Sequence, residues 1–166
     1  MAAAAQIHKP SEYEVKAAYL YSFGKFVKWP SSAPQNNSFL VCVLGNDPFG
    51  STLDSLVNGE LIDGKRLSTA RVNTPAEAAK CRVLFIGVRE ASRMSSILSD
   101  LHNTPVLTVS DAPDFVDRGG MLQFVVQDDK VRFLVNLGAA ERAGLSLSSE
   151  LLKVAVSVKR NQGAGD

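Results

Sequence analysis

Three continuous apolar runs, each followed by a segment of different pattern, constrain the fold of this chain more than any other feature. The runs are FLVCVLG (39–45), CRVLFIGV (81–88) and TPVLTVSD (104–111). An unbroken apolar run bounded by Gly or Asp is typical of a strand covered on both faces. The first two runs precede helix-like segments at 47–57 and 89–102. Strands that alternate with helices predict parallel crossovers and therefore an α/β fold.

The pattern changes after residue 120, where two alternating segments flank a two-residue turn. MLQFVVQ (121–127) and KVRFLVN (130–136) surround Asp128 and Asp129, which is the signature of a β-hairpin. We therefore predict a single-domain α/β sandwich over residues 11–160. Its central sheet is expected to be mostly parallel, with the C-terminal antiparallel hairpin at one edge and helices on both faces. Residues 1–10 and 161–166 are expected to be disordered or artificial tails.

Two weaker segments complete the expected architecture. The more polar run GKRLSTARV (64–72) predicts an edge strand. Near the C-terminus, helical spacing predicts a last helix that is capped by Ser146 or Ser148 and extends to Val158. Its buried side chains are expected to be Leu147, Leu151, Val154, Ala155 and Val158.

An amphipathic helix is predicted at the N-terminus. Ser11 and Glu14 have the spacing of a capping box, and Pro30 should end the helix. The lysines at positions 16, 25 and 28 are expected on the solvated face. The expected buried stripe consists of Val15, Ala18, Tyr19, Phe23, Phe26 and Val27.

Charge and length exclude several classes of function. The net charge of the 166-residue chain is +1, which gives no strong field to attract nucleic acid or an anionic membrane. No apolar run approaches the ~20 residues that a membrane helix needs. The first residues, MAAAAQIHKP, lack the basic and apolar regions of a signal peptide.

The residues provide little support for catalysis. The chain has two histidines, His8 and His102, and contains no G-x-S-x-G, Walker A or H-E-x-x-H motif. Metal-ligand spacing is absent as well. We therefore expect no enzyme activity, no metal and no cofactor. A clustered pair with strongly shifted pKa values among Asp47, Glu90, His102 and Asp111 would reverse that expectation.

A binding site is more plausible at the carboxyl ends of the buried strands, where open α/β sheets bind ligands. If the first and third strands are both central, their following turns share one rim. The candidate ligand-binding residues are Gly45, Asn46, Asp47, Ser110 and Asp111; the alternative is a pair of ordinary turns. The aromatic residues Trp29, Phe49 and Phe115 are candidate partner contacts, although each can equally belong to the core.

In combination, these segments resemble the YfiR family of bacterial periplasmic proteins over residues 12 to 158. The resemblance rests on KAAYLYSFGKFVKWP (16–30), FLVCVLGNDPFG (39–50) and CRVLFIG (81–87). It continues through TPVLTVSDAPDFVDRGGMLQFV (104–125) and VRFLVNLGAAERAGLSLSSELLKVA (131–155).

What the resemblance implies is regulation. The family's namesake is a periplasmic repressor that holds an inner-membrane diguanylate cyclase inactive by binding its periplasmic sensor domain. Cyclic di-GMP signalling and biofilm formation follow from that control. Similar domains are fused to sensor histidine kinases. The expected partner is therefore the periplasmic domain of a cyclase or sensor kinase, with a small-ligand sensor as the alternative function. A homodimer is also expected, and the signal peptide is presumed to have been removed.

The same resemblance bears on the two cysteines, Cys42 and Cys81. Composition alone leaves open whether they are buried free thiols or a disulfide. They match the family's half-cystines, and disulfides persist in the oxidising periplasm, so a bridge is implied. This chain lacks the namesake's second cysteine pair near the C-terminus. The remaining bridge is therefore expected to be structural, and a redox switch that needs the second pair is not expected.

Overall fold

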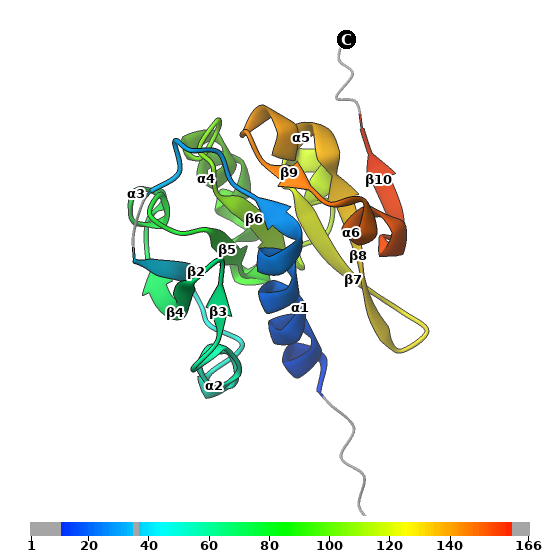
Figure 1. Ribbon diagram of the computed structural model, residues 1–166. Coiled ribbons are helices and arrows are strands. Elements are labelled where there is room, and N and C mark those ends of the chain that lie inside the picture. The colour runs from blue at the N-terminus through cyan, green and yellow to red at the C-terminus, as the bar shows by residue number, and fades with distance from the viewer. Residues whose placement is uncertain (1–10, 35–36, 161–166) are drawn as a thin grey trace, which may run out of the picture.

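The fold is built on one mixed, mostly parallel sheet, as the alternating pattern predicts (Figure 1). The computed structural model describes residues 11–34 and 37–160. Eight strands follow the order β10-β8-β7-β6-β5-β2-β4-β3. The central strands β2, β5 and β6 are mutually parallel, and β4 joins β2 in parallel. Their bounds are Ser38–Leu44 for β2, Lys65–Val72 for β4, Val83–Ile86 for β5 and Leu107–Ser110 for β6.

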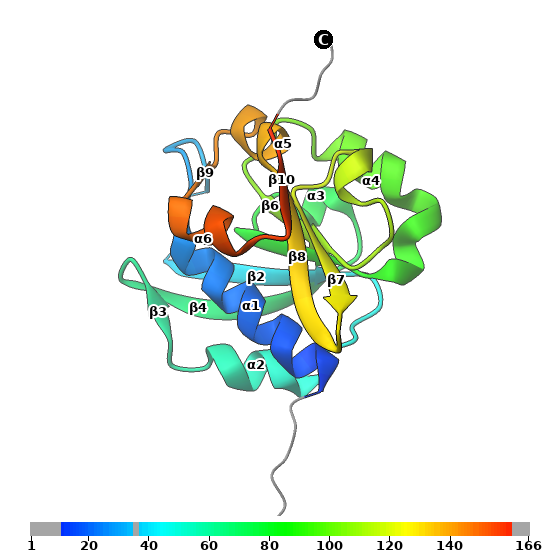
Figure 2. The same cartoon turned by 90° about the vertical axis from the view of Figure 1, so that its right-hand side faces the viewer.

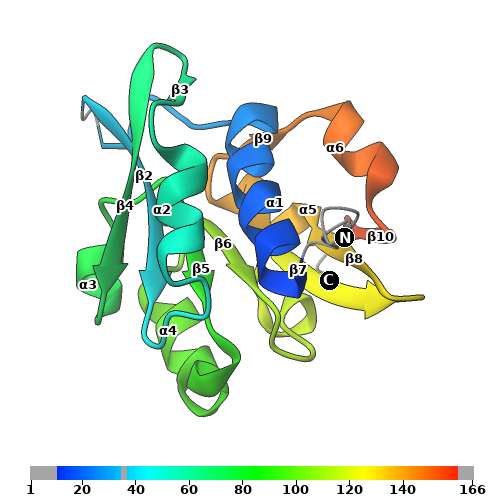
Figure 3. The same cartoon turned by 90° about the horizontal axis from the view of Figure 1, so that it is seen from below.

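Helices cover both faces of the sheet, which confirms the layered arrangement. Figure 2 shows α1 and α2 on one side and α3 and α4 on the other. Figure 3 gives the same division seen from below. Two separate clusters of buried side chains correspond to the two layers. The helices are α1 (Glu12–Phe26), α2 (Ser51–Val57), α3 (Pro75–Ala78) and α4 (Met94–Asp100), with a short 3-10 turn, η2 (Val88–Arg93), before α4.

The antiparallel hairpin has the predicted form. Strands β7 (Leu122–Gln127) and β8 (Lys130–Asn136) pair through a turn in which Asp128 and Asp129 have φ values of 52° and 62°. Two successive positive φ angles belong to the type I′ turn that two-residue hairpins favour. The side chains of Val131, Phe133 and Val135 are all buried on one face, as their alternation predicts.

The hairpin is followed by a segment that does not continue as predicted. A short helix, α5 (Leu137–Arg142), leads into β9 (Ser146–Leu147) and α6 (Ser149–Val154). Ser148 caps α6, but the helix does not reach Val158. Residues Ser157–Lys159 instead form β10, which pairs in parallel with β8 and lies outside the hairpin at that edge. Val154, expected to be buried, is 56% exposed.

The opposite edge also differs from the expectation for GKRLSTARV. This segment forms β4, the second strand from the edge. The outermost strand is the two-residue β3 (Leu61–Ile62), which pairs antiparallel with β4. Sequence patterns detect a two-residue strand poorly because two residues carry no periodicity.

Helix α1 begins as predicted and ends earlier than predicted. The Ser11 hydroxyl accepts from the Glu14 N–H at 3.2 Å, and the Ser11 N–H donates to Glu14 Oε1 at 2.6 Å. The helix stops at Phe26 rather than beside Pro30, because Val27 and Lys28 form the strand β1. That strand pairs antiparallel with β9.

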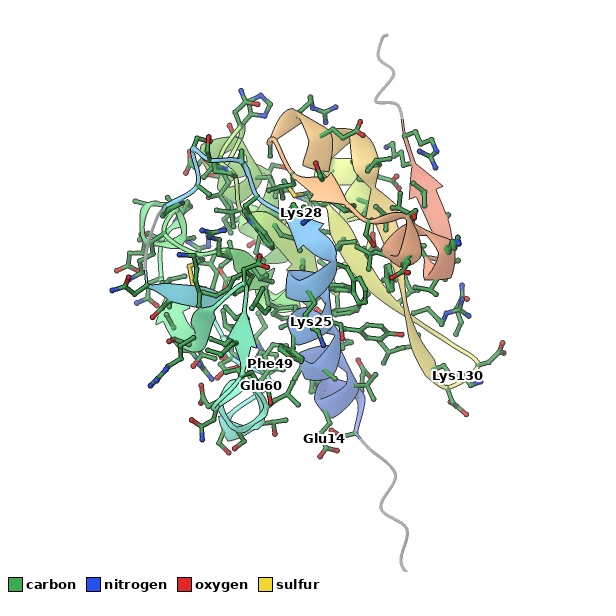
Figure 4. The ribbon with its side chains drawn as sticks, in the orientation of Figure 1. Glu14, Lys25, Lys28, Phe49, Glu60 and Lys130 are labelled. Atoms are coloured by element: carbon green, nitrogen blue, oxygen red, sulfur yellow. A yellow bond between two sulfur atoms is a disulfide. The ribbon has the colours of Figure 1, made fainter. Side chains whose placement is uncertain are left out.

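The buried face of α1 is rotated from the expected stripe. Phe26 and Ala18 are exposed, although both were placed in the buried stripe. The lysine at position 16 was placed in water but is buried. The buried residues of α1 are Lys16, Ala17, Leu20, Phe23 and Gly24. Figure 4 labels Lys25 and Lys28, which are exposed as expected.

The two cysteines form a disulfide, as the family resemblance implies. Cys42 lies on β2 and Cys81 lies just before the neighbouring strand β5, with 6.1 Å between their Cα atoms. Both side chains are completely buried, in the core cluster that also contains side chains of α3 and α4. The bridge therefore ties the central strands together beneath one helical layer.

Candidate functional site

The most unusual chemistry in the described residues gathers around Asp111, immediately after β6. Helix α1 crosses the sheet there and brings two side chains to the same carboxylate oxygen. The Tyr13 hydroxyl donates to Asp111 Oδ2 at 2.8 Å, and Lys16 Nζ lies 2.9 Å from that oxygen. Lys16 also pairs with Glu12, one helical turn earlier. The ammonium is therefore shared by two carboxylates.

Burial makes this cluster energetically important. The Lys16 side chain is 2% exposed and that of Asp111 is 10% exposed. The ammonium lies 4.6 Å from the centre of the Tyr13 ring and 5.7 Å from that of Phe124. A charge removed from water in this way is tolerated when it is paired and hydrogen-bonded. The Glu12 contact follows from i,i+4 spacing, but the contact with Asp111 could not be read from the spacing of residues along the helix.

The electrostatics of the cluster have two further consequences. Burial, together with the hydrogen bond to Asp111, raises the pKa of Tyr13 above its ordinary value of 10.0. The second oxygen of the aspartate, Oδ1, is buried and has no hydrogen-bond partner within the described chain. A buried acceptor without a donor is costly and is a natural place for a ligand atom.

Asp111 lies between two hollows. The first has a volume of about 200 Å³ and opens at the carboxyl ends of β2, β5 and β6. Its lining is Tyr13, Asn46, Pro48, Phe85, Gly87, Val88, Arg89 and Asp111. Aromatic and apolar walls with a few polar groups are typical of small-molecule sites.

The second hollow lies on the other side of Asp111 and is wider, about 380 Å³. It runs between the start of α1, the loop after β6 and strand β7. Its lining is Glu12, Lys16, Val88, Asp111, Pro113, Gln123, Phe124, Val125 and Val126.

Only part of the expected rim is brought to these hollows. Asn46 and Asp111 line the first one together. Asp47 instead pairs with Arg71 at 2.9 Å and accepts from the Phe49 N–H at 2.9 Å.

Two further rim candidates have structural roles. The completely buried Ser110 hydroxyl donates to the Ile86 carbonyl at 2.6 Å and accepts from the Ala112 N–H at 3.0 Å. Gly45 has φ +80°, and a Cβ atom there would lie 2.5 Å from Glu90 Oε2. That position therefore needs glycine for backbone conformation and space.

The aromatic contact candidates belong largely to the core. Phe115 is 0% exposed and Phe49 is 4% exposed, so neither offers a surface to a partner in this conformation. Phe49, labelled in Figure 4, packs edge-on against Phe85 with ring centres 4.9 Å apart. Trp29 is partly buried and packs edge-on against Phe39. Phe49 and Phe115 are therefore core residues in this structure.

Asp47, Glu90, His102 and Asp111, the candidate acid–base groups, do not form hydrogen bonds or ion pairs with one another in the described structure. Asp47 pairs with Arg71 and Glu90 pairs with Arg93. His102 lines a separate hollow of about 50 Å³ beside α4 and α5. Among the residues that the structure describes, no group of three potential metal ligands occurs.

Sequence reasoning missed Tyr13, Lys16 and Arg89 as site residues. Tyr13 and Lys16 are three residues apart and therefore share a helix face, which is the only local signal that they could act together. Their partner lies 95 residues beyond Lys16. Arg89 lies in η2, three residues after the end of β5. The argument from strand ends that selected Asn46 could have included it.

Comparisons with known proteins give a family and a fold. A family model described as YfiR/HmsC-like matches residues 13–156. A crystal structure of a conserved domain protein from Vibrio cholerae is similar with a TM-score of 0.56 and 16% identity. An ABC domain in complex with L-Trp from Streptococcus pneumoniae is similar with a TM-score of 0.52 and 14% identity.

These structural likenesses extend over part of larger chains. The match covers 90% of this chain and 60% of the Vibrio chain. For the Streptococcus domain it covers 76% of this chain and 57% of the other. At such identities the likeness establishes the shared fold alone. In the described part of the chain, no helix is long and apolar enough to cross a membrane.

Proposed function

The chain belongs to the YfiR/HmsC-like family, and we propose that it is a non-enzymatic periplasmic repressor of an inner-membrane diguanylate cyclase. In this role it binds the cyclase's periplasmic sensor domain, lowers cyclic di-GMP and restrains biofilm formation. The observation that carries the proposal is the family match over residues 13–156.

Two features of the molecule support this proposal. The disulfide between Cys42 and Cys81 suits an oxidising compartment such as the periplasm. Asp47 and Glu90, two of the four candidate acid–base groups, lie in separate ion pairs with Arg71 and Arg93. Regulation by contact also fits a homodimer, which sedimentation at several protein concentrations would detect.

A gene deletion tests the proposal. Cells that lack the protein should contain more cyclic di-GMP and form more biofilm than the parent strain. Expression of the chain with a periplasmic export signal should restore the parental level. The same chain kept in the cytoplasm is the matched control and should not restore it. Unchanged cyclic di-GMP after deletion, together with no crosslink to any inner-membrane protein, would refute repression.

A second candidate function is small-ligand sensing for a cyclase or a sensor kinase. It is favoured by Asp111, which lines the first hollow and whose Oδ1 has no hydrogen-bond partner among the described residues. A ligand that donates a hydrogen bond to this oxygen would stabilise one conformation and bias partner binding. A thermal-shift screen should then identify a stabilising compound whose effect is lost in Asn46→Ala and kept in Asn58→Ala, a substitution at an exposed turn far from the hollow. A screen of periplasmic metabolites without any such compound would count against sensing.

A further inference from the structure

Strand β7 has an edge that the sheet leaves open. Its neighbour β6 pairs with it at two positions only, Val109 with Leu122 and Ser110 with Gln123. Strand β6 then ends, and the chain turns away at Asp111. Residues 124–127 of β7 consequently have no strand beside them on this side within the described chain. The hairpin tip, where Figure 4 labels Lys130, projects past α1.

The register shows which backbone groups face outward. The Asn136 N–H donates to the Met121 carbonyl at 2.7 Å, so this pair is hydrogen-bonded across the hairpin. Hydrogen-bonded and non-hydrogen-bonded pairs alternate along antiparallel strands. Val126 and Val131 therefore form a non-hydrogen-bonded pair. The N–H and C=O of Val126 point away from β8, toward the open side.

The opposite edge of the hairpin supports this assignment. Val131 should likewise direct its backbone groups outward, away from β7. Its carbonyl does accept a hydrogen bond there, from the Tyr19 hydroxyl at 3.2 Å. Helix α1 thus covers part of the β8 edge, whereas no described strand covers residues 124–127 of β7.

The second hollow occupies the space where another strand would lie. It follows residues Gln123 to Val126 and has Val88 and Pro113 on its far side. Val126 is 53% exposed and Val88 is 45% exposed, so the edge is flanked by apolar side chains. An extended segment can join such an edge through main-chain hydrogen bonds, with alternate side chains in the adjoining pockets.

The charged side chains that line this hollow and the hairpin beside it have a net negative charge. Glu12 and Asp111 line the hollow, and Lys16, the one cation of that lining, already pairs with both. The hairpin adds Asp128 and Asp129 at its turn against Lys130 and Arg132, and Arg132 lies opposite Val125 in the ladder. Among the residues that the structure describes, Asp111 Oδ1 also has no donor. A second copy of this edge would place like charges opposite one another, whereas a basic segment would complement them.

We infer that the open edge of β7 binds an extended, basic segment of another protein as an added strand. Alternate side chains of that segment are apolar and pack against Val126 and Val88, and the others are Lys or Arg. Asp111 Oδ1 accepts from one of these cations. The inference rests on the proposed function, because the segment belongs to the cyclase's periplasmic part.

The primary test uses two synthetic peptides, acetyl-TKVKVKVT-amide and its twin with Glu in place of every Lys. The basic peptide should bind the full chain and slow hydrogen exchange at the Val126 amide, with NMR shifts confined to residues 88, 111, 113 and 123–127. The acidic peptide should bind at least tenfold more weakly. Equal binding of both peptides, shifts located elsewhere, or no binding of the basic peptide would overturn the inference.

Substitutions on the two edges separate docking from stability. Val126→Pro removes the outward N–H without breaking a ladder bond to β8, and should weaken basic-peptide binding at least tenfold. Val131→Pro removes the corresponding N–H on the other edge, with binding unchanged in the folded variant. Because the Val131 side chain is buried and that of Val126 is exposed, it is the harsher control for stability. Val126→Thr keeps the N–H and should bind within about threefold of the parent. Loss of binding in both proline variants alike would show a stability effect and refute the assignment to β7.

Other outcomes distinguish the alternatives. Protection of the Val126 amide that grows with protein concentration, without peptide, would mean that a second copy occupies the edge and would also refute the inference. If Val126→Pro still lowers cyclic di-GMP in cells as fully as the parent chain, the edge is not the cyclase's docking site although repression stands. If the parent chain itself has no effect on cyclic di-GMP, the proposed function fails independently of the peptide result.

Discussion

Replacing Lys16 by Met tests whether the buried cluster holds α1 on the sheet. Methionine keeps most of the aliphatic stem and loses the ammonium. Asp111 would then remain 10% exposed with only the Tyr13 hydroxyl as a donor. We expect Lys16→Met to lower the free energy of unfolding, because it leaves a largely buried carboxylate without its counter-charge.

The expected loss can be bounded from the geometry. At the 2.9 Å separation of Nζ and Oδ2, Coulomb's law with an effective dielectric constant of about 20 gives roughly 6 kcal/mol before desolvation is counted. Removing one partner of a buried pair typically costs about 3–5 kcal/mol. We expect about 3 kcal/mol, since Asp111 keeps one hydrogen bond and some contact with water.

Urea unfolding followed by circular dichroism measures the effect in a double-mutant cycle. Asp111→Asn should cost about 2–3 kcal/mol alone, because it leaves the Lys16 ammonium with the exposed Glu12 only. The double variant Lys16→Met/Asp111→Asn should be more stable than the sum of the single effects predicts, by about 2 kcal/mol. Glu12→Gln is the control and should cost less than about 1 kcal/mol, because Glu12 is half exposed.

Two results would refute this reasoning. One is a loss below about 1 kcal/mol for Lys16→Met, which would mean that water reaches the cluster. The other is additivity of the two single effects within about 0.5 kcal/mol, which would mean that Lys16 and Asp111 do not interact.

Three further predictions concern the disulfide, a close contact and the tyrosine. Cys42 and Cys81 are 39 residues apart, so replacing both by Ala should lower the free energy of unfolding by about 4 kcal/mol on the chain-entropy account. Urea titration of the variant and the oxidised parent measures the difference, and a loss under about 1 kcal/mol would contradict it. Gly120→Ala should cost about 1–3 kcal/mol, because its Cβ would lie 2.1 Å from the buried Phe115 ring; an unchanged melting temperature would contradict it. The pKa of Tyr13 is raised above 10.0 on folding, chiefly by burial. Its contribution to stability is therefore complete below pH 10 and is lost as the pH rises through the folded pKa. Tyr13→Phe should flatten the decline in stability above pH 10 and remove the last phenolate step from the absorbance titration. A parent protein whose tyrosines all ionise near pH 10 would contradict it.

The local signals in the sequence were reliable where the determining contact is also local. The Ser11 capping box depends on atoms three residues apart, and both of its hydrogen bonds are present. The Asp128–Asp129 turn is likewise specified by two residues and their immediate neighbours. The Asn136 side chain at the start of α5 likewise accepts from the Ala139 N–H, three residues along the chain.

The candidate site was predicted only in part for the same reason. The rim argument found Asn46 and Asp111, because the carboxyl ends of neighbouring parallel strands must lie close together. It could not show that Asp47 lies outside the hollow, because the ion pair between Asp47 and Arg71 depends on how β4 pairs with β2. Phe49 and Phe115 could not be assigned to core or surface from their type alone.

By itself the sequence determined the class of fold, the hairpin and its turn, and the start of the first helix. Each of these follows from hydrophobic period or from hydrogen bonds within a few residues. Only the tertiary structure decided that Lys16 faces inward, that residues 157–159 form a strand, and that β7 keeps an open edge. Each of those features depends on partners far away in the chain: Asp111 for the lysine, β8 for the last strand, and the early end of β6 for the edge.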